Sequence, residues 1–168
     1  MPERAATSGI VPPAGAEILI EDAAPADAAA ILALQRLCYQ SEARRYGDRT
    51  IPPLTQTLPE LRAEFATSVI LAARLGERII GSVRAREEGG CVSIGRLIVH
   101  PEYQRRGLGT ALMAAIEWRF APPACFELFT GHRSDGNLQF YRRLGYVEHR
   151  REAVSDRLCL VYLRKRVA

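Results

Sequence analysis

The chain has 168 residues, of which 48% are hydrophobic and 25% are charged. This length is typical of one domain, and the composition excludes a disordered, collagen-like or coiled-coil chain. The formal net charge of +4 is unevenly spread, because residues 1–90 carry 10 basic and 12 acidic side chains while residues 91–168 carry 13 and 7. We therefore expect the second half of the chain to meet an anionic ligand.

Arginine dominates the basic residues, since only Lys165 among the 23 is a lysine. A chain rich in alanine and arginine but poor in lysine is what a GC-rich genome encodes, so most of the arginines need no functional explanation. They are not accompanied by a nucleic-acid recognition motif or by interleaved aromatic residues. We therefore expect no nucleic-acid partner.

The cysteines and the hydropathy pattern bear on location. Cys38, Cys91, Cys125 and Cys159 lie in apolar stretches with no CxxC pair and no histidine at metal-ligand spacing. This pattern predicts four unpaired core residues, a reducing compartment and no metal site. No apolar run reaches the roughly 20 residues that span a bilayer, and the N-terminus lacks the apolar region of a signal peptide. We expect a cytoplasmic protein without a membrane partner.

The first half of the chain predicts a tail followed by short helices and a meander. Residues 1–16, rich in proline and glycine, are expected to form a flexible tail before a single domain over 17–168. A strand at 17–21 and a helix over 25–39 come next. A polar segment over 41–56 is expected to be a loop unless it folds around a ligand, and a second helix begins at the capping-box pair Thr57 and Glu60. Glycine-containing turns then separate three strand-like runs, at 68–75, 78–86 and 91–99.

The second half alternates helices and strands. An apolar stripe at helical spacing runs from Leu108 to Arg119, and a helix over 135–144 ends at Gly145. Strands are predicted at 125–130, 146–151 and 157–164. The helix between the strands at 91–99 and 125–130 requires these two strands to be parallel. The prediction is an α+β fold with a mixed, mostly antiparallel sheet of about six to seven strands flanked by helices, in the order β-α-α-β-β-β-α-β-α-β-β.

The segment LIVHPEYQRRGLGTALM at 97–113 carries the clearest functional signal. A strand ends at Val99, and a turn leads through Gln104 into a helix whose entry contains Gly107 and Gly109. Glycines lack the Cβ atoms that would keep a ligand away from the backbone N–H groups of a helix N-terminus, where phosphate is favoured. A P-loop would need GK[ST] here, and a dinucleotide fingerprint would need a small residue in place of Leu112. The segment therefore predicts a pyrophosphate cradle of another kind.

The pattern Gln-x-x-Gly-x-Gly between a strand and an amphipathic helix resembles the acetyl-coenzyme A motif of the GNAT superfamily of N-acetyltransferases. The segment ELFTGHRSDGNLQFYRRLGY at 127–146 is similar to a second signature of that family, with its Asn-containing helix start and Tyr-x-x-x-Gly-Tyr ending. The predicted order of elements also agrees. The resemblance implies a GNAT-like domain that moves an acetyl group from acetyl-coenzyme A directly to a primary amine of a small molecule or peptide.

The resemblance also implies the residues that bind the coenzyme. They are Leu97, Ile98, Val99, Gln104, Arg105, Arg106, Gly107, Leu108, Gly109, Thr110, Asn137 and Tyr141. Backbone groups at 97 and 99 are expected to meet the thioester and pantetheine, and residues 104–110 the pyrophosphate. Tyr141 is implied as the proton donor to the leaving thiolate. A core role for Tyr141, a capping role for Asn137 and a solvated pair at 105–106 remain the structural alternatives.

The general base and the acceptor site are less defined. Many family members carry a glutamate on the strand before the motif, where this chain has Ser93. Glu127 on the next strand is the alternative catalytic residue, a water relay is equally acceptable, and we expect no single indispensable base. Acceptor contacts are expected from the acidic half and from the end of the strand at 125–130, at Tyr39, Glu42, Tyr46 and His132.

A second functional interpretation and the oligomeric state remain open. The absence of a glutamate at 93 favours a non-catalytic acyl-coenzyme A sensor, whereas intact Tyr141 and Asn137 argue against it. No cysteine has an adjacent base, so we expect direct transfer without an acyl-cysteine. A homodimer stays open, since dimers are common among similar proteins.

Overall fold

A computed structural model describes residues 5–6, 17–123 and 125–167 of the chain. Its strands are β1 (Ala5–Ala6), β2 (Ile18–Asp22), β3 (Val69–Leu75), β4 (Arg78–Glu88), β5 (Cys91–Val99), β6 (Cys125–Gly131), β7 (Val147–Ala153) and β8 (Cys159–Arg166). Its helices are α1 (Ala28–Cys38), α2 (Gln40–Tyr46), α3 (Pro52–Thr55), α4 (Leu58–Glu64), α5 (Leu108–Trp118) and α6 (Asp135–Arg143), with 3-10 turns at Pro25–Asp27 and Pro101–Tyr103.

The strands form one mixed sheet in the order β1-β2-β3-β4-β5-β6-β8-β7. The described pairings are antiparallel except that of β5 with β6, which the crossover through α5 makes parallel. The predicted α+β fold and mostly antiparallel sheet are therefore confirmed. The two-residue β1 adds a strand within the segment expected to be a tail, and the rest of that segment, at 1–4 and 7–16, lies outside the described residues.

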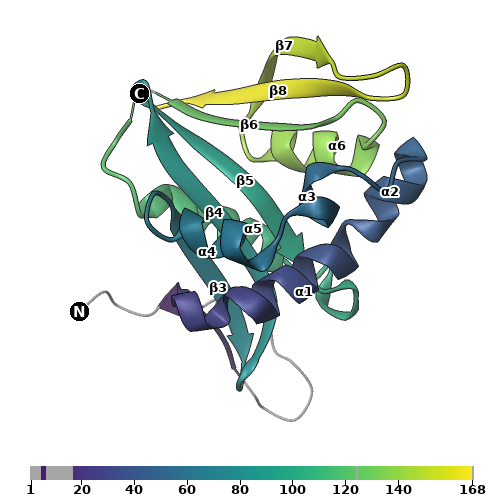
Figure 1. Ribbon diagram of the computed structural model, residues 1–168. Helices are drawn as coiled ribbons and strands as arrows, with labels where there is room; N and C mark the ends of the chain where they lie inside the picture. The colour runs from purple at the N-terminus through teal and green to yellow at the C-terminus, as the bar shows by residue number, and fades with distance from the viewer. Residues whose placement is uncertain (1–4, 7–16, 124, 168) are drawn as a thin grey trace.

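The parallel strands β5 and β6 pair over a short stretch and then separate. Residues Cys91–Ser93 pair with Cys125–Glu127, and β5 continues to Val99 and β6 to Gly131 with no further described pairing between them. Figure 1 shows β4 and β5 running away from β6 and β8, from a common end near the C-terminus. The sheet is therefore split in its middle, where β5 beyond Ser93 has an unpaired edge facing β6.

A β-bulge bends β5 where it leaves β6. The pairing of β4 with β5 shifts between Ser82 and Arg84, so that Val83 faces two residues of β5. One of them, Arg96, has a φ of 50°, in the left-handed region that non-glycine residues rarely adopt. A bulge of this kind increases the local twist and redirects the strand, which is consistent with β5 turning away from β6.

Helices cover both faces of the sheet because buried strand residues alternate between two cores. On β3, Leu71 and Ala73 belong to the core that includes α5, whereas Ile70 and Ala72 belong to the core that includes α1 and α4. In Figure 1, α1 and α4 lie in front of the sheet and α5 lies behind it. The two layers of helices hold the separated strands in place from opposite sides.

The polar segment at 41–56, expected to be a loop, contains the two short helices α2 and α3, which corrects that expectation. Gly47 ends α2 in the left-handed conformation, with a φ of 62°, and Pro52 and Pro53 occupy the first turn of α3. The helix breakers in the sequence therefore mark the ends of two helices rather than one long loop. Burial of Ala43 and Tyr46 packs α2 against the rest of the domain.

A buried polar network holds α1, α3 and α4 against β4. Gln35 is fully buried and donates hydrogen bonds to the carbonyl oxygen of Pro53 at 2.8 Å and to Oε1 of Gln56 at 3.1 Å. Arg84 donates to both glutamines and forms an ion pair with Glu64 at 3.1 Å. Burial lowers the pKa of Arg84 to about 10 against the opposing charge of Glu64, so the guanidinium stays charged at neutral pH.

Two of the four cysteines are paired, which corrects the expectation of four free core thiols. Cys91 and Cys125 form a disulfide between the first residues of β5 and β6, and their Cα atoms are 4.7 Å apart. Cys38 and Cys159 are free. The parallel register brings the pair together across 34 residues of sequence, with no local motif to indicate it. The cysteine argument for a reducing compartment therefore fails, and the cytoplasmic location stays a prediction.

Replacing Gln35 tests the buried polar network. Gln35→Leu removes hydrogen-bond partners from the Pro53 carbonyl and from Arg84 within the core, so we expect a loss of about 1–3 kcal/mol of unfolding free energy. Urea denaturation followed by circular dichroism measures it. The exposed residue of the same type at the start of α2 provides the control, since Gln40→Leu should change stability by less than about 0.5 kcal/mol. Equal effects of the two substitutions would contradict the importance of the network.

Candidate active site

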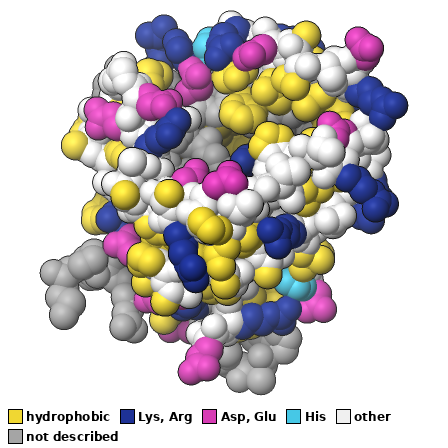
Figure 2. All heavy atoms as spheres, in the orientation of Figure 1, with side chains coloured by type: hydrophobic (Ala, Val, Ile, Leu, Met, Phe, Trp, Pro, Cys, Tyr) yellow, Lys and Arg dark blue, Asp and Glu magenta, His cyan; other side chains and the backbone are white. Residues whose placement is uncertain are grey.

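The opening between β5 and β6 is a cavity of about 1040 Å³. Its lining comes from the C-terminal end of α1, from α2, from the segment around α3, from β5 at Ile94–Val99, from the N-terminus of α5, from the end of β6 and from α6. Figure 2 shows a hollow in this face of the molecule, with hydrophobic and acidic side chains along its edge. The cavity therefore joins segments from nearly the whole length of the chain.

The N-terminus of α5 supplies a cradle of backbone N–H groups at one side of the cavity. Gly107 caps the helix with a φ of 85° and a ψ of 3°, and a Cβ atom at this position would meet no other atom within 4 Å. The open space lies next to the first turn of α5, whose N–H groups have no partner within the helix. Gln104, Arg105 and Thr110 also line the cavity, so this side fits a phosphate-bearing ligand.

The strand end before the cradle is fixed by two side chains. Gln104 donates a hydrogen bond from Nε2 to the carbonyl oxygen of Val99 at 3.0 Å, and the thiol of Cys38 donates to the same oxygen at 3.3 Å. Burial raises the pKa of Cys38 to about 11 despite this hydrogen bond, so the group remains a thiol at neutral pH. Leu97, Ile98 and Val99 all line the cavity.

Helix α6 forms the opposite side. Asn137 donates from Nδ2 to Oγ1 of Thr130 at 3.2 Å, which ties the helix to the end of β6. Gly109 of α5 lies close to Phe140, and a Cβ atom at 109 would be 3.4 Å from that ring. Asn137 and Tyr141 both line the cavity, so α6 faces the cradle across it.

Tyr141 is held as a neutral phenol. Burial is the main cause that raises the pKa of its hydroxyl well above the ordinary value of 10.0, with smaller electrostatic contributions from Tyr39 and Glu42. The hydroxyl therefore keeps its proton throughout the neutral and mildly alkaline range. A phenol in this state can donate a proton but is a poor base.

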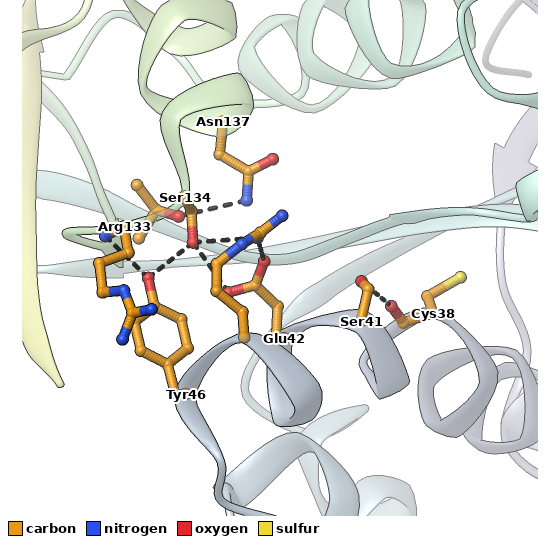
Figure 3. A network of polar contacts seen from close by, with 9 residues as sticks. Cys38, Ser41, Glu42, Tyr46, Arg133, Ser134 and Asn137 are labelled. Atoms are coloured by element: carbon orange, nitrogen blue, oxygen red, sulfur yellow. Dashed lines mark hydrogen bonds and ion pairs between the residues drawn. The ribbon is translucent and has the colours of Figure 1, made fainter. Parts of the chain in front are cut away.

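A polar network joins α2 to the turn before α6, as Figure 3 shows. The hydroxyl of Tyr46 shares a hydrogen bond of 2.8 Å with Oγ of Ser134 and accepts one of 3.0 Å from the backbone N–H of Arg133. Ser134 donates to Glu42 at 2.8 Å, and Arg45 forms an ion pair with the same carboxylate. The network places the carboxylate of Glu42, from the first half of the chain, beside α6.

The acceptor residues predicted from the first half therefore line the cavity together. Tyr39, Glu42 and Tyr46 are all lining residues. Burial raises the pKa of Tyr39, and Glu42 contributes to the shift while Arg96 and Arg84 oppose it. The charge of Glu42 raises the pKa of both Tyr39 and Tyr141, so its carboxylate contributes to the field at both phenols.

Four predicted site residues do not line the cavity, and the first is Glu127. Its carboxylate pairs with Arg164 at 2.5 Å and with His149 at 3.1 Å. Partial burial raises the pKa of Glu127, but the hydrogen bond and charge of Arg164, with help from His149, outweigh it and lower the pKa overall. Glu127 also lies in the paired part of β6, opposite Ser93 and before the strands separate. We therefore do not retain it as the base.

The other three residues make contacts within the protein. His132 accepts a hydrogen bond at Nδ1 from the backbone N–H of Cys159 at 2.9 Å, which ties β6 to β8. Leu108 is buried in the core beneath α5. The guanidinium of Arg106 lies over the ring of Tyr103, 5.6 Å from its centre. None of the three is among the residues that line the cavity.

The sequence interpretation missed several lining residues. Arg96 lies at the bulge, and Ile51 and Pro53 come from the segment expected to be a loop. The pair of prolines at 52–53 was the available signal for the second group, since it marks a helix start. The position of Arg96 depends on a bulge that has no sequence signature.

Among the described residues, no three or more His, Cys, Asp or Glu side chains gather as metal ligands. None of the described helices is long and apolar enough to cross a membrane.

Solved structures with the same fold include several acetyltransferases. PaiA N-acetyltransferase from Thermoplasma acidophilum, in complex with coenzyme A, has a TM-score of 0.74 and 15% identity over 89% of this chain and 99% of that chain. YncA from Salmonella typhimurium, with its cofactor acetyl-CoA, has a TM-score of 0.69 and 19% identity over 90% and 94%. An N-acetyltransferase from Staphylococcus aureus has a TM-score of 0.71 and 14% identity over 89% and 98%.

At these low identities the three structures establish a shared fold. The model of the Acetyltransferase (GNAT) family matches residues 29–146, a range that begins in α1 and includes both sides of the cavity. The match spans more than half of the chain and contains both motifs found in the sequence, the glycine-containing turn before α5 and the α6 segment. The chain therefore belongs to the GNAT acetyltransferase family and is an acyltransferase.

Proposed function

We propose that the protein transfers an acetyl group from acetyl-coenzyme A directly to a primary amine of a small molecule or peptide. The observation that carries the proposal is that one cavity contains the cradle at Gly107, the neutral phenol of Tyr141 and the carboxylate of Glu42. These groups suit, in turn, a pyrophosphate, a leaving thiolate and an amine. Coenzyme-bound structures with the same fold support the donor.

The coenzyme fits the side of the cavity formed by α5 and α6. When bound, acetyl-coenzyme A supplies an activated acetyl group and a thiolate leaving group. The N–H groups at the start of α5 and the nearby Arg105 hold negative charge at the pyrophosphate. Asn137 has one Nδ2 hydrogen bond, to Thr130, and its exposed amide can offer further hydrogen bonds to the pantetheine arm.

The unpaired edge of β5 provides the backbone groups that the reaction needs. Beyond Ser93 this edge has no described ladder partner on the β6 side, and residues 94–99 line the cavity. Fixed backbone N–H groups stabilise the oxyanion that forms when an amine attacks a thioester. Leu97 and Val99, which end the strand next to the cradle, are proposed for this contact and for the pantetheine arm.

Proton transfers are assigned to Tyr141 and to the acceptor side. The nitrogen–carbon bond forms first and gives the oxyanion, which then collapses with cleavage of the carbon–sulfur bond. Overall the amine nitrogen loses a proton and the sulfur gains one. Tyr141 donates from its hydroxyl to the sulfur. The amine proton leaves to water or to the carboxylate of Glu42, which also attracts the ammonium form of the acceptor to the cavity. No single base is assigned, because water can take the amine proton as well as the carboxylate of Glu42.

The experiment that tests the proposal measures release of free thiol from acetyl-coenzyme A across a panel of primary amines. Turnover with at least one amine, and acetylation of that amine by mass spectrometry, is expected. Calorimetry with coenzyme A runs in parallel. Coenzyme binding without turnover on any amine would instead support the non-catalytic sensor, and absence of binding would contradict both.

Gly107 is the first test residue, because its left-handed conformation and open Cβ position form the cradle. Gly107→Val should weaken coenzyme A binding at least about tenfold in calorimetry, since valine strains the turn by about 1–3 kcal/mol and fills the ligand space. Gly90→Val is the matched control, with a φ of 84° and equally open space in the turn between β4 and β5. We expect the two variants to lose similar stability, and only Gly107→Val to lose affinity for coenzyme A.

Tyr141→Phe tests the proton donor. We expect kcat to fall about 100-fold or more, with the dissociation constant of coenzyme A changed less than about threefold. Because the pKa of Tyr141 is raised, the phenol remains protonated through pH 10, so the wild-type rate should rise with pH as the acceptor amine deprotonates and show no decline from this residue. Tyr162→Phe, on β8 outside the cavity, is the control. Undiminished turnover of Tyr141→Phe would remove the assigned role.

Glu42→Gln tests attraction of the acceptor. Loss of the carboxylate should raise the KM for the amine about tenfold and leave the KM for acetyl-coenzyme A unchanged, because the coenzyme is held by other elements. Steady-state kinetics with each substrate varied in turn separates the two effects. The exposed Glu77 in the turn between β3 and β4 supplies the control, and Glu77→Gln should change neither constant. A rise only in the coenzyme KM would place Glu42 on the wrong side of the cavity.

A further inference from the structure

Arg96 presents an incompletely satisfied cationic group to the cavity. Its side chain lines the cavity from the bulge in β5, and its Nε atom is buried with no hydrogen-bond partner among the described residues. The guanidinium lies over the ring of Tyr39, with its carbon 6.0 Å from the ring centre. The described residues therefore offer this guanidinium no hydrogen-bond acceptor, and a charged donor left without an acceptor is costly, so an acceptor group from a ligand at its cavity side would be stabilising.

Two arginines, Arg45 in the lining and Arg84 beside it on β4, are paired with carboxylates, in contrast to Arg96. Arg45 is paired with Glu42, and Arg84 is paired with Glu64 at 3.1 Å. No ion pair of Arg96 with a carboxylate is found within the described ranges. The charge of Arg96 also helps to lower the pKa of Arg84, after the larger effect of burial, so two cations lie close enough to repel each other. An anion beside Arg96 would relieve this local excess of positive charge.

The backbone fixes where Arg96 points. The bulge holds the residue at a φ of 50°, and the adjoining residue is Leu97, assigned above to the reacting end of the coenzyme. The contact with Tyr39 places the guanidinium toward the end of α1, on the acceptor side. The cradle for the coenzyme phosphates lies beyond the end of β5, at the turn into α5. Arg96 is therefore placed beside the acceptor rather than the pyrophosphate.

We propose that the acceptor is a small amine that also carries a carboxylate, and that Arg96 binds this carboxylate. The inference rests on the proposed function and names its class of substrate. A guanidinium presents two parallel N–H donors that match the two oxygens of a carboxylate. The amine of the same molecule lies toward Glu42 and Tyr141. The acceptor side thus carries the carboxylate of Glu42, paired with Arg45, and the guanidinium of Arg96, unpaired among the described residues, so its uncompensated charge is positive and favours an acceptor with a carboxylate beside its amine.

The test compares each standard amino acid with its primary amide as acceptor for acetyl-coenzyme A. The amide keeps the amine and side chain but has no carboxylate. For at least one pair, wild-type protein should show a kcat/KM roughly 10- to 100-fold higher for the acid, expressed mainly in KM. Arg96→Met should bring this ratio close to one without changing the KM for acetyl-coenzyme A.

Two further variants keep the result interpretable. Arg96→Lys keeps the charge but not the paired donors and should retain part of the preference, so it serves if Arg96→Met folds poorly. Arg86→Met removes an exposed arginine that pairs with Glu88 outside the cavity, and it should leave the preference unchanged. Equal rates with acid and amide in every pair, or an equal loss on both in Arg96→Met, would overturn the inference while the acetyltransferase function stands.

A failure of the proposed function gives a different pattern. In that case no amine of either series releases thiol, and calorimetry with coenzyme A and each amino acid decides the inference alone. Amino-acid binding that Arg96→Met abolishes would sustain the carboxylate site without catalysis. Absence of such binding in the wild-type protein would overturn it.

Discussion

The separation of β5 from β6 after three paired residues is the constraint on which the site depends. A parallel ladder that continued to Val99 would use the backbone groups along this edge of β5 and close the cavity. The bulge at Arg96 bends β5 away, and the disulfide between Cys91 and Cys125 joins the strands at their paired end. The edge beyond Ser93 is therefore left for a ligand. An unpaired strand edge inside a protein is normally a liability, and a bound ligand that pairs with it removes the liability.

The two sides of the cavity are assembled by different means. The cradle on the coenzyme side is local in sequence, since the strand end, the turn and the start of α5 follow one another within residues 97–110. The acceptor side depends on contacts between distant segments, such as the hydrogen bond from Ser134 to Glu42 across 92 residues. The close fit of Tyr46 against Gly131, where a Cβ atom would lie 2.0 Å from the tyrosine hydroxyl, belongs to this second group. Side-chain changes at this glycine would displace α2 and with it the acceptor side.

This difference explains how much could be predicted from the sequence. The fold and the parallel pairing across α5 follow from periodicity and agree with the structure. The contiguous motif at 104–110 is found at the cavity, although Arg106 and Leu108 do not line it. The sequence could not show that Glu127 lies outside the cavity. That depends on where β5 and β6 separate, and Glu127 is still paired with β5, opposite Ser93. The disulfide was missed for the same reason, since only the parallel register brings residues 91 and 125 together. The helices at 40–46 and 52–55 were missed because Gly47, Pro52 and Pro53, which end one helix and begin the next, are also typical of a loop.

The charge pattern also has a more specific explanation in the folded protein. The division of the chain at residue 90 suggested an acidic half for the acceptor and a basic half for the coenzyme. The structure brings the two halves together on the acceptor side, where Glu42 comes from the first and Arg96 from the second. Net charge along the sequence is informative for the proposed coenzyme side, because α5 and α6 both come from the basic half of the chain. It cannot predict the acceptor side, where the relevant quantity is the balance between individual charges: the carboxylates of Glu42 and Glu64 are already engaged by arginines, and the guanidinium of Arg96 is not.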